Sequence, residues 1–572
     1  MKNNQGSKNI KVKSWLQFIL TVAVVIIIAS LSSLARIRLD LTEDRRYTLS
    51  DPTAKILSDL RNDIYIQVYL DGEMPIPLKR LRRSVQEMLD EFRIASGRRV
   101  DYEFINPAAV KDVKQREAQF QILSDKGLSP VYAQAPDDEG GLSTKMIFPG
   151  MIINYNGIEI PVNFLKNNQA ISYEQNILHS IESLEYEMIQ TIATVSSDTV
   201  YKVAFLEGQD EFPEIEVADI TFNLARFFTI DRGTISGQPG ILDDYAAVII
   251  AGPREEFTEA DKFVLDQYIM KGGKVLWLFE EVAVNSDSLL YSRETVGLYR
   301  PLNIEDQLFR YGVRINPEIV QDIDCALLRL TVMSGGRKQI VPAPWVYYPL
   351  LNPSQDHPVT RNLNKVKGEF ANFIDTVGFD PAIRKTMLLS TSSSSRTLSP
   401  PLVIRLKEAE QQPAEKDFNR SDLPVAILLE GVFPSAFRNR ITANLIGNTD
   451  FSIRNESTET KMIVVADADI IRNDVRRVGT TETPYALGQD RYTGEVLFGN
   501  RDFIINCLNY LVDDNNIMEL RSREIKLRLL DKTRIRNEKT KWQVINITGP
   551  VILVVLAGIL YGWTRKRVYT KY

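Results

Sequence analysis

Two long apolar stretches without charged side chains lie near the two ends of the chain. Each contains about twenty residues, which as a helix rising about 1.5 Å per residue extend about 30 Å, the thickness of a bilayer's hydrocarbon core. Lys and Arg residues flank both stretches. The pattern therefore predicts transmembrane helices at residues 15–35 and 544–563. Pro550 is expected near the start of the second helix, where its missing N–H costs least.

The first stretch has an alternative interpretation as a cleaved signal peptide, because residues 33–35 (Ser-Leu-Ala) resemble a cleavage site. We favour an uncleaved anchor, since signal peptides usually have apolar regions of only about 7–15 residues. Two spans would place residues 1–14 and 564–572 together as cytoplasmic tails. Flanking charges alone do not decide the orientation, but long domains cross largely regardless of charge. We therefore predict a protein of the inner (cytoplasmic) membrane with two spans and the bulk of the chain in the periplasm.

Strand and helix patterns alternate over residues 47–197 and predict a first α/β module. A β-branched and aromatic run at residues 64–70 is typical of a strand, and apolar residues at helical spacing follow it. Asn156-Gly157, between two alternating apolar runs, predicts a tight hairpin. The order strand–helix–strand–helix–hairpin–helix is that of a thioredoxin-like fold. The module contains no cysteine, so we expect a scaffold use of this fold and not an oxidoreductase.

A second α/β domain is predicted over residues 201–515. The continuous apolar run at residues 274–280 is typical of a parallel strand that is covered on both faces, so we expect a doubly wound sheet. An amphipathic helix is expected around residues 222–228. The polar or Ser/Pro-rich insertions are expected to be surface loops, and a charged juxtamembrane stalk should lead to the second span. The insertions are residues 286–302 and 390–422, and the stalk is residues 519–543.

Composition and motifs exclude several classes of function. The 69 Lys and Arg residues nearly balance the 74 Asp and Glu residues, for a net charge of −5, which argues against a nucleic-acid partner. Two cysteines and two histidines make a Cys-based or His-rich metal centre implausible. The sequence has no phosphate-binding G-x-x-x-x-G-K-[ST], G-x-G-x-x-G, H-E-x-x-H or G-x-S-x-G motif. We therefore predict no catalytic residue, no cofactor and no metal site.

A few residues remain as weak candidates for chemistry. Asp467 and Asp469 follow a predicted strand and could bind Mg²⁺ or Ca²⁺, or act as an acid/base pair, but a solvated strand end or a helix N-cap is favoured. His179 and His357 are expected to be packed or surface residues, since no nucleophile motif accompanies them. Free thiols are expected at the two cysteines, with a disulfide as the alternative outside the cytoplasm.

Five segments together resemble the GldG family of gliding-motility-associated ABC transporter accessory proteins. They lie at residues 40–51 (DLTEDRRYTLSD), 265–281, 305–322, 523–534 (REIKLRLLDKTR) and 542–546 (WQVIN). The resemblance implies an ABC permease and a separate ATPase as partners. It also implies that the central region is an auxiliary, substrate-binding-like domain similar to glutamine-amidotransferase folds. Catalytic members of that wider fold carry a cysteine after a central strand, which this chain lacks, so we expect no enzyme.

The segment just after the first span is a candidate contact with the permease. Its local alternative is a helix N-cap at Ser50 or Asp51, with Pro52 at the first helical position, and the two interpretations are compatible. We predict a non-catalytic membrane-anchored accessory subunit that contacts membrane lipid, a permease and an ATPase. The alternatives are a membrane-anchored envelope hydrolase and a solute-binding receptor. The candidate contact residues are Arg46, Tyr47, Leu49, Ser50 and Asp51.

Overall fold

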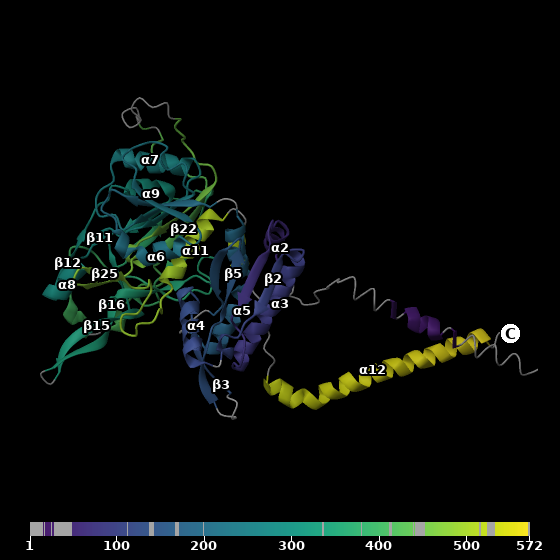
Figure 1. The fold of residues 1–572 in the computed structure, drawn as a ribbon. Coiled ribbons are helices and arrows are strands. Elements are labelled where there is room, and N and C mark those ends of the chain that lie inside the picture. The colour runs from purple at the N-terminus through teal and green to yellow at the C-terminus, as the bar shows by residue number, and fades with distance from the viewer. Residues whose placement is uncertain are drawn as a thin grey trace, which may run out of the picture. The chain divides into compact units, whose positions relative to one another are not determined.

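The computed structural model divides the chain into two units, residues 1–523 and 524–572, which we describe separately. Figure 1 shows the ribbon of the elements named below. The structure describes residues 15–16, 18–24, 26–27, 48–110, 112–136, 142–165, 171–197, 200–334, 337–378, 380–410, 414–438, 440, 452–513, 516–522 and 532–569.

The first α/β module has a four-stranded sheet in the order β2-β1-β5-β6. Strand β2 is parallel to β1, whereas β5 runs antiparallel to both β1 and β6. The predicted order of elements is confirmed, with one additional hairpin, β3–β4, while the name thioredoxin-like stays a prediction. The elements are α2 (Asp51–Ser58), β1 (Ile64–Val68), α3 (Ile76–Ala95), β2 (Val100–Phe104), η1 (Pro107–Ala109), α4 (Val113–Asp125), β3 (Val131–Pro136), β4 (Leu142–Ile147), β5 (Gly150–Tyr155), β6 (Ile158–Asn163) and α5 (Tyr173–Ser196).

The predicted hairpin joins β5 and β6. Tyr155 pairs with Ile158, so only Asn156 and Gly157 form the turn. Their φ angles are 52° and 85°, and a two-residue turn of the primed type requires such positive values. The hairpin prediction is confirmed.

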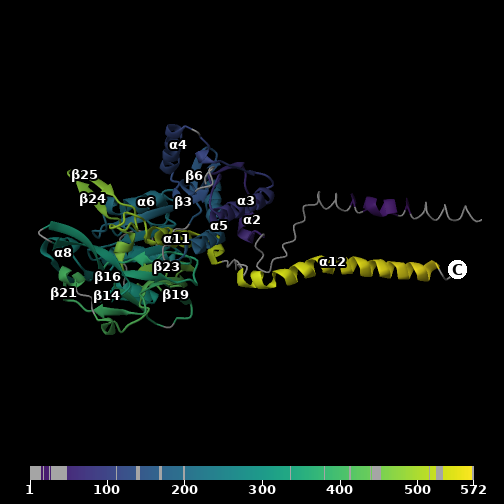
Figure 2. The ribbon, with the colours of Figure 1, turned by 90° about the horizontal axis from the view of Figure 1, so that it is seen from below.

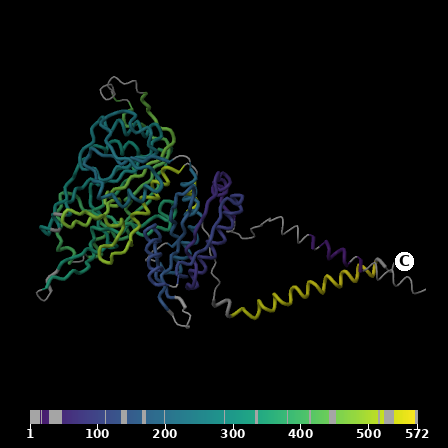
Figure 3. The backbone as a smooth tube through the Cα atoms, viewed as in Figure 1, coloured from purple at the N-terminus to yellow at the C-terminus, as the bar shows by residue number. Residues whose placement is uncertain are grey.

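The second domain contains a large mixed sheet in the order β15-β16-β19-β22-β23-β10-β9-β7-β8. The neighbouring strands β8, β7, β9, β10 and β23 are parallel to one another. Beyond β23, the strands β22, β19, β16 and β15 extend the sheet, each antiparallel to its neighbour. Figure 3 shows the later, green part of the chain returning among the teal strands. The elements of the large sheet are β7 (Lys202–Glu207), β8 (Thr229–Thr234), β9 (Ala247–Ala251), β10 (Val275–Leu278), β15 (Cys325–Ser334), β16 (Arg337–Pro353), β19 (Ile383–Ser390), β22 (Pro424–Gly431) and β23 (Thr460–Val465).

Strands β9 and β10 are buried over their whole length, because helices cover both faces of the parallel strands. Side chains of α7 (Glu259–Met270) and α9 (Glu305–Tyr311) share one apolar core with alternate residues of β9, β10 and β23. On the other face α11 (Asn500–Val512) packs on β9, β10 and β23 and beside α6 (Ala218–Leu224). The bottom view in Figure 2 also shows α11 near β23. The protein is thus a mixed α/β protein, as predicted.

Two local predictions in this domain are wrong. The helix expected around residues 222–228 ends at Leu224, and β8 begins at Thr229. The insertions 286–302 and 390–422 are not loops, because they form short strands that pair with distant partners. Strand β12 (Glu294–Tyr299) of the first insertion pairs with β21 (Leu402–Arg405) of the second, and β20 (Ser395–Leu398) of the second pairs with β14 (Ile319–Asp322). The remaining elements are η2 (Glu214–Glu216), β11 (Val282–Ala283), α8 (Ser286–Ser292), β12 (Glu294–Tyr299), β13 (Val313–Asn316), β14 (Ile319–Asp322), β17 (Val366–Lys367), β18 (Phe373–Thr376), β20 (Ser395–Leu398), β21 (Leu402–Arg405), η3 (Leu406–Glu410), η4 (Glu415–Asp417), η5 (Ala468–Ile471), β24 (Val475–Val478), β25 (Thr481–Pro484) and η6 (Ile517–Ser522).

The second unit contains the helix α12 (Lys532–Tyr569), whose residues 537–567 are long and apolar enough to cross a membrane. The predicted span 544–563 lies within it. Pro550 sits inside this helix and not at its start, because the helix already begins in the charged segment expected to be a stalk. Residues 15–16, 18–24 and 26–27 of the first predicted span are helical. The rest of that span lies outside the described residues, so the two-span topology stays a prediction.

Candidate functional site

The carboxyl ends of the parallel strands meet at one edge of the large sheet, where α/β domains usually bind their ligands. Strand β7 leads to α6 on one face and β9 leads to α7 on the other, so the crevice between β7 and β9 is the topological switch point. In a domain of this kind, ligand-binding or catalytic side chains are therefore expected at this edge.

The aromatic ring of Phe212 occupies the crevice between β7 and β9. Only 5% of Phe212 is exposed. Gly252, at φ +67°, makes room for it, because a Cβ atom there would lie 2.6 Å from a ring carbon. The guanidinium groups of Arg254 and Arg472 lie 5.4 and 5.0 Å from the ring centroid. The chain thus fills its own switch point with an apolar side chain whose ring lies near two cations.

The next part of the same edge, at β10 and β23, is covered by the segment around Glu369 to Asn372. The backbone N–H of Asn372 donates to Ala466 O at 2.8 Å, and its side-chain oxygen accepts from Glu281 N at 2.7 Å. Glu369 N donates to Asp467 Oδ2 at 2.9 Å. These bonds fasten the segment to the ends of both strands, which leaves the edge occupied by protein.

Asp467 and Asp469 lie under this segment. Asp467 is fully buried and caps η5, since its Oδ1 accepts from Asp469 N at 3.0 Å. Burial, together with the nearby carboxylates of Asp469 and Glu280, raises the pKa of Asp467 well above its usual range. Burial raises the pKa of Asp469 to about 7, although Arg472 pairs with it at 3.1 Å. The N-cap interpretation is confirmed, but the strand end is buried and not solvated.

The other candidates from the sequence are structural. His357 is buried, its Nδ1 accepts from Val359 N at 3.3 Å, and burial lowers the pKa of His357 to about 4. His179 lies half-buried in α5, and burial lowers the pKa of its imidazole. Cys325 and Cys507 are free thiols. Among the residues that the structure describes, no group of three His, Cys, Asp or Glu side chains could hold a metal ion.

The predicted partner segment lies only partly within the structure, because Arg46 and Tyr47 fall outside the described residues. Ser50 is the N-cap of α2: its Oγ accepts from Thr53 N at 3.3 Å, and its own N–H donates to Glu185 Oε1 at 2.8 Å. The capping alternative is thus confirmed. Leu49 is half-buried and Asp51 is exposed, while their contact with a permease stays a prediction.

Replacing Ser50 by alanine is expected to lower the free energy of unfolding by about 1 kcal/mol, because α2 loses its side-chain cap. Thermal unfolding of the full chain in detergent measures the effect. Ser58→Ala in the same helix is the control, since the exposed Ser58 hydroxyl bonds only to Lys55 O and Asp59 Oδ1 nearby. Equal stability of the Ser50 and Ser58 variants would contradict the capping role.

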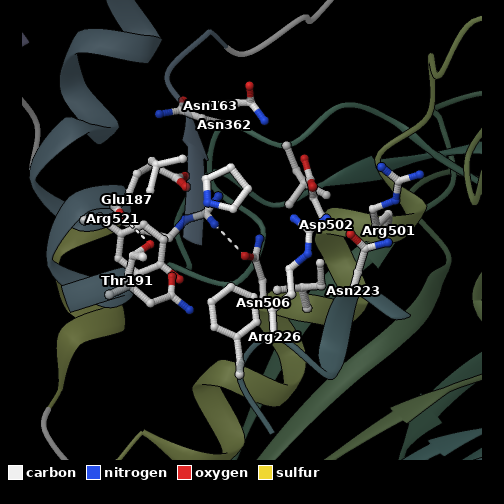
Figure 4. Close-up of a pocket in the computed structure, with 17 residues that line it drawn as sticks. Asn163, Glu187, Thr191, Asn223, Arg226, Asn362, Arg501, Asp502, Asn506 and Arg521 are labelled. Carbon is white, nitrogen blue, oxygen red and sulfur yellow. Dashed lines mark hydrogen bonds between the residues drawn. The ribbon is translucent and has the colours of Figure 1, made fainter. Parts of the chain in front are cut away.

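A polar pocket of about 220 Å³ lies elsewhere, between the first module and the second domain. Helix α5 and strand β6 line it from the module, and α6, α11 and η6 line it from the domain. Figure 4 shows Arg226, Arg501 and Arg521 among its lining side chains. No sequence pattern indicates this pocket, because its lining residues are scattered from position 161 to position 521 without a motif.

Known protein families match both the first module and the second domain. The family described as "ABC-type uncharacterized transport system" matches residues 201–507, more than half of the chain. A "domain of unknown function (DUF7088)" matches residues 43–154. An uncharacterized protein of Borreliella burgdorferi is 19% identical over 570 residues, covering 96% of this chain and 98% of that protein. A solved structure named "mmIFT52 N-terminal domain" is 16% identical with a TM-score of 0.31, covering 55% of this chain and 98% of that one.

Proposed function

The chain belongs to the ABC-type uncharacterized transport system family of auxiliary proteins, and we propose that it is a non-catalytic, membrane-anchored accessory subunit of an ABC-type transporter complex. The observation that carries the proposal is the family match over residues 201–507. The filled carboxyl edge of the same domain supports the non-catalytic part, because Phe212 and the segment around Glu369 occupy the place where an α/β enzyme would bind its substrate.

The roles assigned to the other subunits follow from a motif that this sequence lacks. Without a nucleotide phosphate-binding motif, ATP hydrolysis falls to a separate ATPase subunit and passage through the membrane to a permease. In this proposal α12 is a membrane anchor, residues 15–35 form a second one, and the body acts in the periplasm as a scaffold or substrate-binding-like domain. A thioredoxin-like module without redox cysteines and a doubly wound domain make up that body. Arg46, Tyr47, Leu49, Ser50 and Asp51 are the proposed contact with the permease.

A role in gliding motility is a further part of the proposal and rests on the resemblance to the GldG family alone. The segments at residues 40–51 and 542–546 carry this resemblance closest to the predicted spans. A deletion strain that still glides over a surface at the wild-type speed would contradict a role in gliding. Such a result would leave the assignment to a transport system intact.

Purification of the tagged full-length chain from native membranes in mild detergent tests the accessory role. We expect two further proteins to be retained, one with an ATP-binding motif and one with several transmembrane helices. The matched control is a variant lacking residues 532–569, which should lose the permease if α12 anchors the complex. Recovery of the chain alone, under conditions that keep the permease and the ATPase together, would overturn the proposal.

A further inference from the structure

The pocket between the module and the domain contains a cation that forms no ion pair with the residues described by the structure. Arg226 follows α6 and is half-buried. Within the described part of the chain, no carboxylate oxygen lies within 4.0 Å of its guanidinium group. The ring of Phe222 lies beside it, with its centroid 5.4 Å from the guanidinium carbon. A half-buried guanidinium group that lacks an ion pair is unusual, since desolvation of a charge normally requires compensation.

A second cation, Arg501, lies near Arg226, so the positive charge at this site is still less well compensated. Burial, followed by the charge of Arg501, lowers the pKa of Arg226, while Asp219 acts in the opposite direction. Asp219 is already engaged, because its two carboxylate oxygens accept from Arg501 Nε at 3.0 Å and from Nη2 at 3.3 Å. One carboxylate therefore serves two guanidinium groups, and the charge of Arg226 remains without its own counter-ion.

The third arginine of the pocket bonds to neutral oxygens. Arg521 Nη1 donates to Asn506 Oδ1 at 2.6 Å, and Nη2 donates to Arg361 O at 2.9 Å. Two carboxylates, Glu187 and Asp502, also line the pocket. They make the site unfavourable for a ligand with many negative charges, but leave it suited to one with a single oxyanion group.

From this arrangement we propose that the pocket binds a small molecule through one oxyanion group, a carboxylate or a phosphate, which Arg226 holds between Arg501 and Arg521. The planar guanidinium group matches both groups, because it donates two parallel hydrogen bonds to a pair of oxygens. A volume of about 220 Å³ suits a small metabolite and excludes a folded partner. Since α5 and α11 both line the site, the ligand would touch the module and the domain at once.

Calorimetric titration of the full-length chain in detergent with inorganic phosphate, and separately with acetate, tests the site. We expect saturable binding of at least one probe, and the probe that binds more tightly identifies the oxyanion. Arg226→Gln should weaken that binding at least tenfold. The matched control is Arg83→Gln on the exposed side of α3, which should bind as the wild type does. Absence of saturable binding of both probes to the wild type would overturn the proposal, as would equal binding by the Arg226 variant.

Thermal unfolding separates this role from a structural one. Removing a half-buried charge that has no counter-ion should leave the melting temperature of Arg226→Gln unchanged or higher in the absence of ligand. Phosphate or acetate should then raise the melting temperature of the wild type and leave that of the variant unchanged. A variant that melts clearly lower without ligand would show that Arg226 serves the fold, and would overturn the inference. Neither experiment depends on the transporter partners, so its failure is distinct from a failure of the proposed function.

Discussion

Replacing Asp266 by alanine should lower the free energy of unfolding by about 3–5 kcal/mol. Asp266 lies fully buried in α7 and accepts four hydrogen bonds. Its Oδ1 accepts from Tyr311 Oη at 2.9 Å and from Ala436 N at 2.7 Å, and its Oδ2 accepts from Ser435 Oγ at 2.7 Å and from Gln267 Nε2 at 2.9 Å. Alanine would leave these buried donors without acceptors and would open a cavity between three segments of the domain.

Thermal and chemical unfolding of the full chain in detergent measure this loss. Asp266→Asn should fall between the wild type and Asp266→Ala, because an amide keeps one acceptor oxygen but turns an N–H₂ group toward other donors. Asp244→Ala is the control, since Asp244 is exposed. If Asp266→Ala unfolded like the Asp244 variant, the carboxylate would not fasten these segments as the structure indicates.

Local sequence patterns were sufficient for the elements that surround Asp266. The cap of helix α7 lies directly before it in the sequence, since Thr258 Oγ1 accepts from Asp261 N at 3.1 Å. Strand β10 could be predicted because all of its residues are apolar, which is typical of a strand buried on both faces. Signals of this kind reside within a few consecutive residues.

Contacts between residues far apart in the sequence could not be predicted from such local patterns. Ser435 lies 169 positions from Asp266 in the sequence, and Tyr311 lies 45 positions away, so nothing near Asp266 signals a buried network. The same reason explains the insertions, since β21 is a strand only because it pairs with β12, more than a hundred residues earlier. Strand propensity depends strongly on such partners. The Ser/Pro-rich composition of the later insertion therefore led to a wrong prediction.

The candidate sites show the same limit. Asp467 could be predicted as a cap from its place after a strand, yet its burial depends on Glu369, 98 positions away. Phe212 carries no sequence signal for filling the switch point, because the room for its ring comes from Gly252, which follows β9. The three arginines of the pocket come from segments that only the tertiary fold brings together. The sequence predicted what chemistry to exclude, and the structure was needed to find where charge remains uncompensated.

The carboxyl edge should also make the stability of the protein depend on pH. Glu281 follows β10 and is only 4% exposed. Burial, followed by the charge of Glu305, raises the pKa of Glu281 to about 8, although Arg314 acts in the opposite direction. In an unfolded chain a glutamate ionises near pH ~4.3. Between about pH 4 and 8 the folded protein therefore holds a proton that the unfolded chain has released, so the free energy of unfolding falls as the pH rises.

This contribution is fully present below about pH 4 and is lost as the pH rises through about 8. Asp469, whose pKa burial raises to about 7, acts in the same direction. His357 acts in the opposite direction at lower pH, because burial lowers the pKa of His357 to about 4 while an unfolded histidine binds a proton below about pH 6.5. Between about pH 6.5 and 8.5 the change in stability therefore comes mainly from the carboxyl groups and not from His357. Across it the free energy of unfolding should fall by about 2 kcal/mol.

Melting temperatures measured between pH 6.5 and 8.5 test this expectation, with Glu281→Gln as the decisive variant. Glutamine keeps the shape of the protonated side chain but cannot ionise in either state, so the variant should already exceed the wild type at pH 6.5, where the unfolded wild-type chain has lost its proton, and exceed it by more at pH 8.5. Glu255→Gln is the control, because Glu255 is exposed and its replacement should leave the slope unchanged. A slope in Glu281→Gln as steep as that of the wild type would mean that the buried carboxyl of Glu281 is not the proton store at this edge.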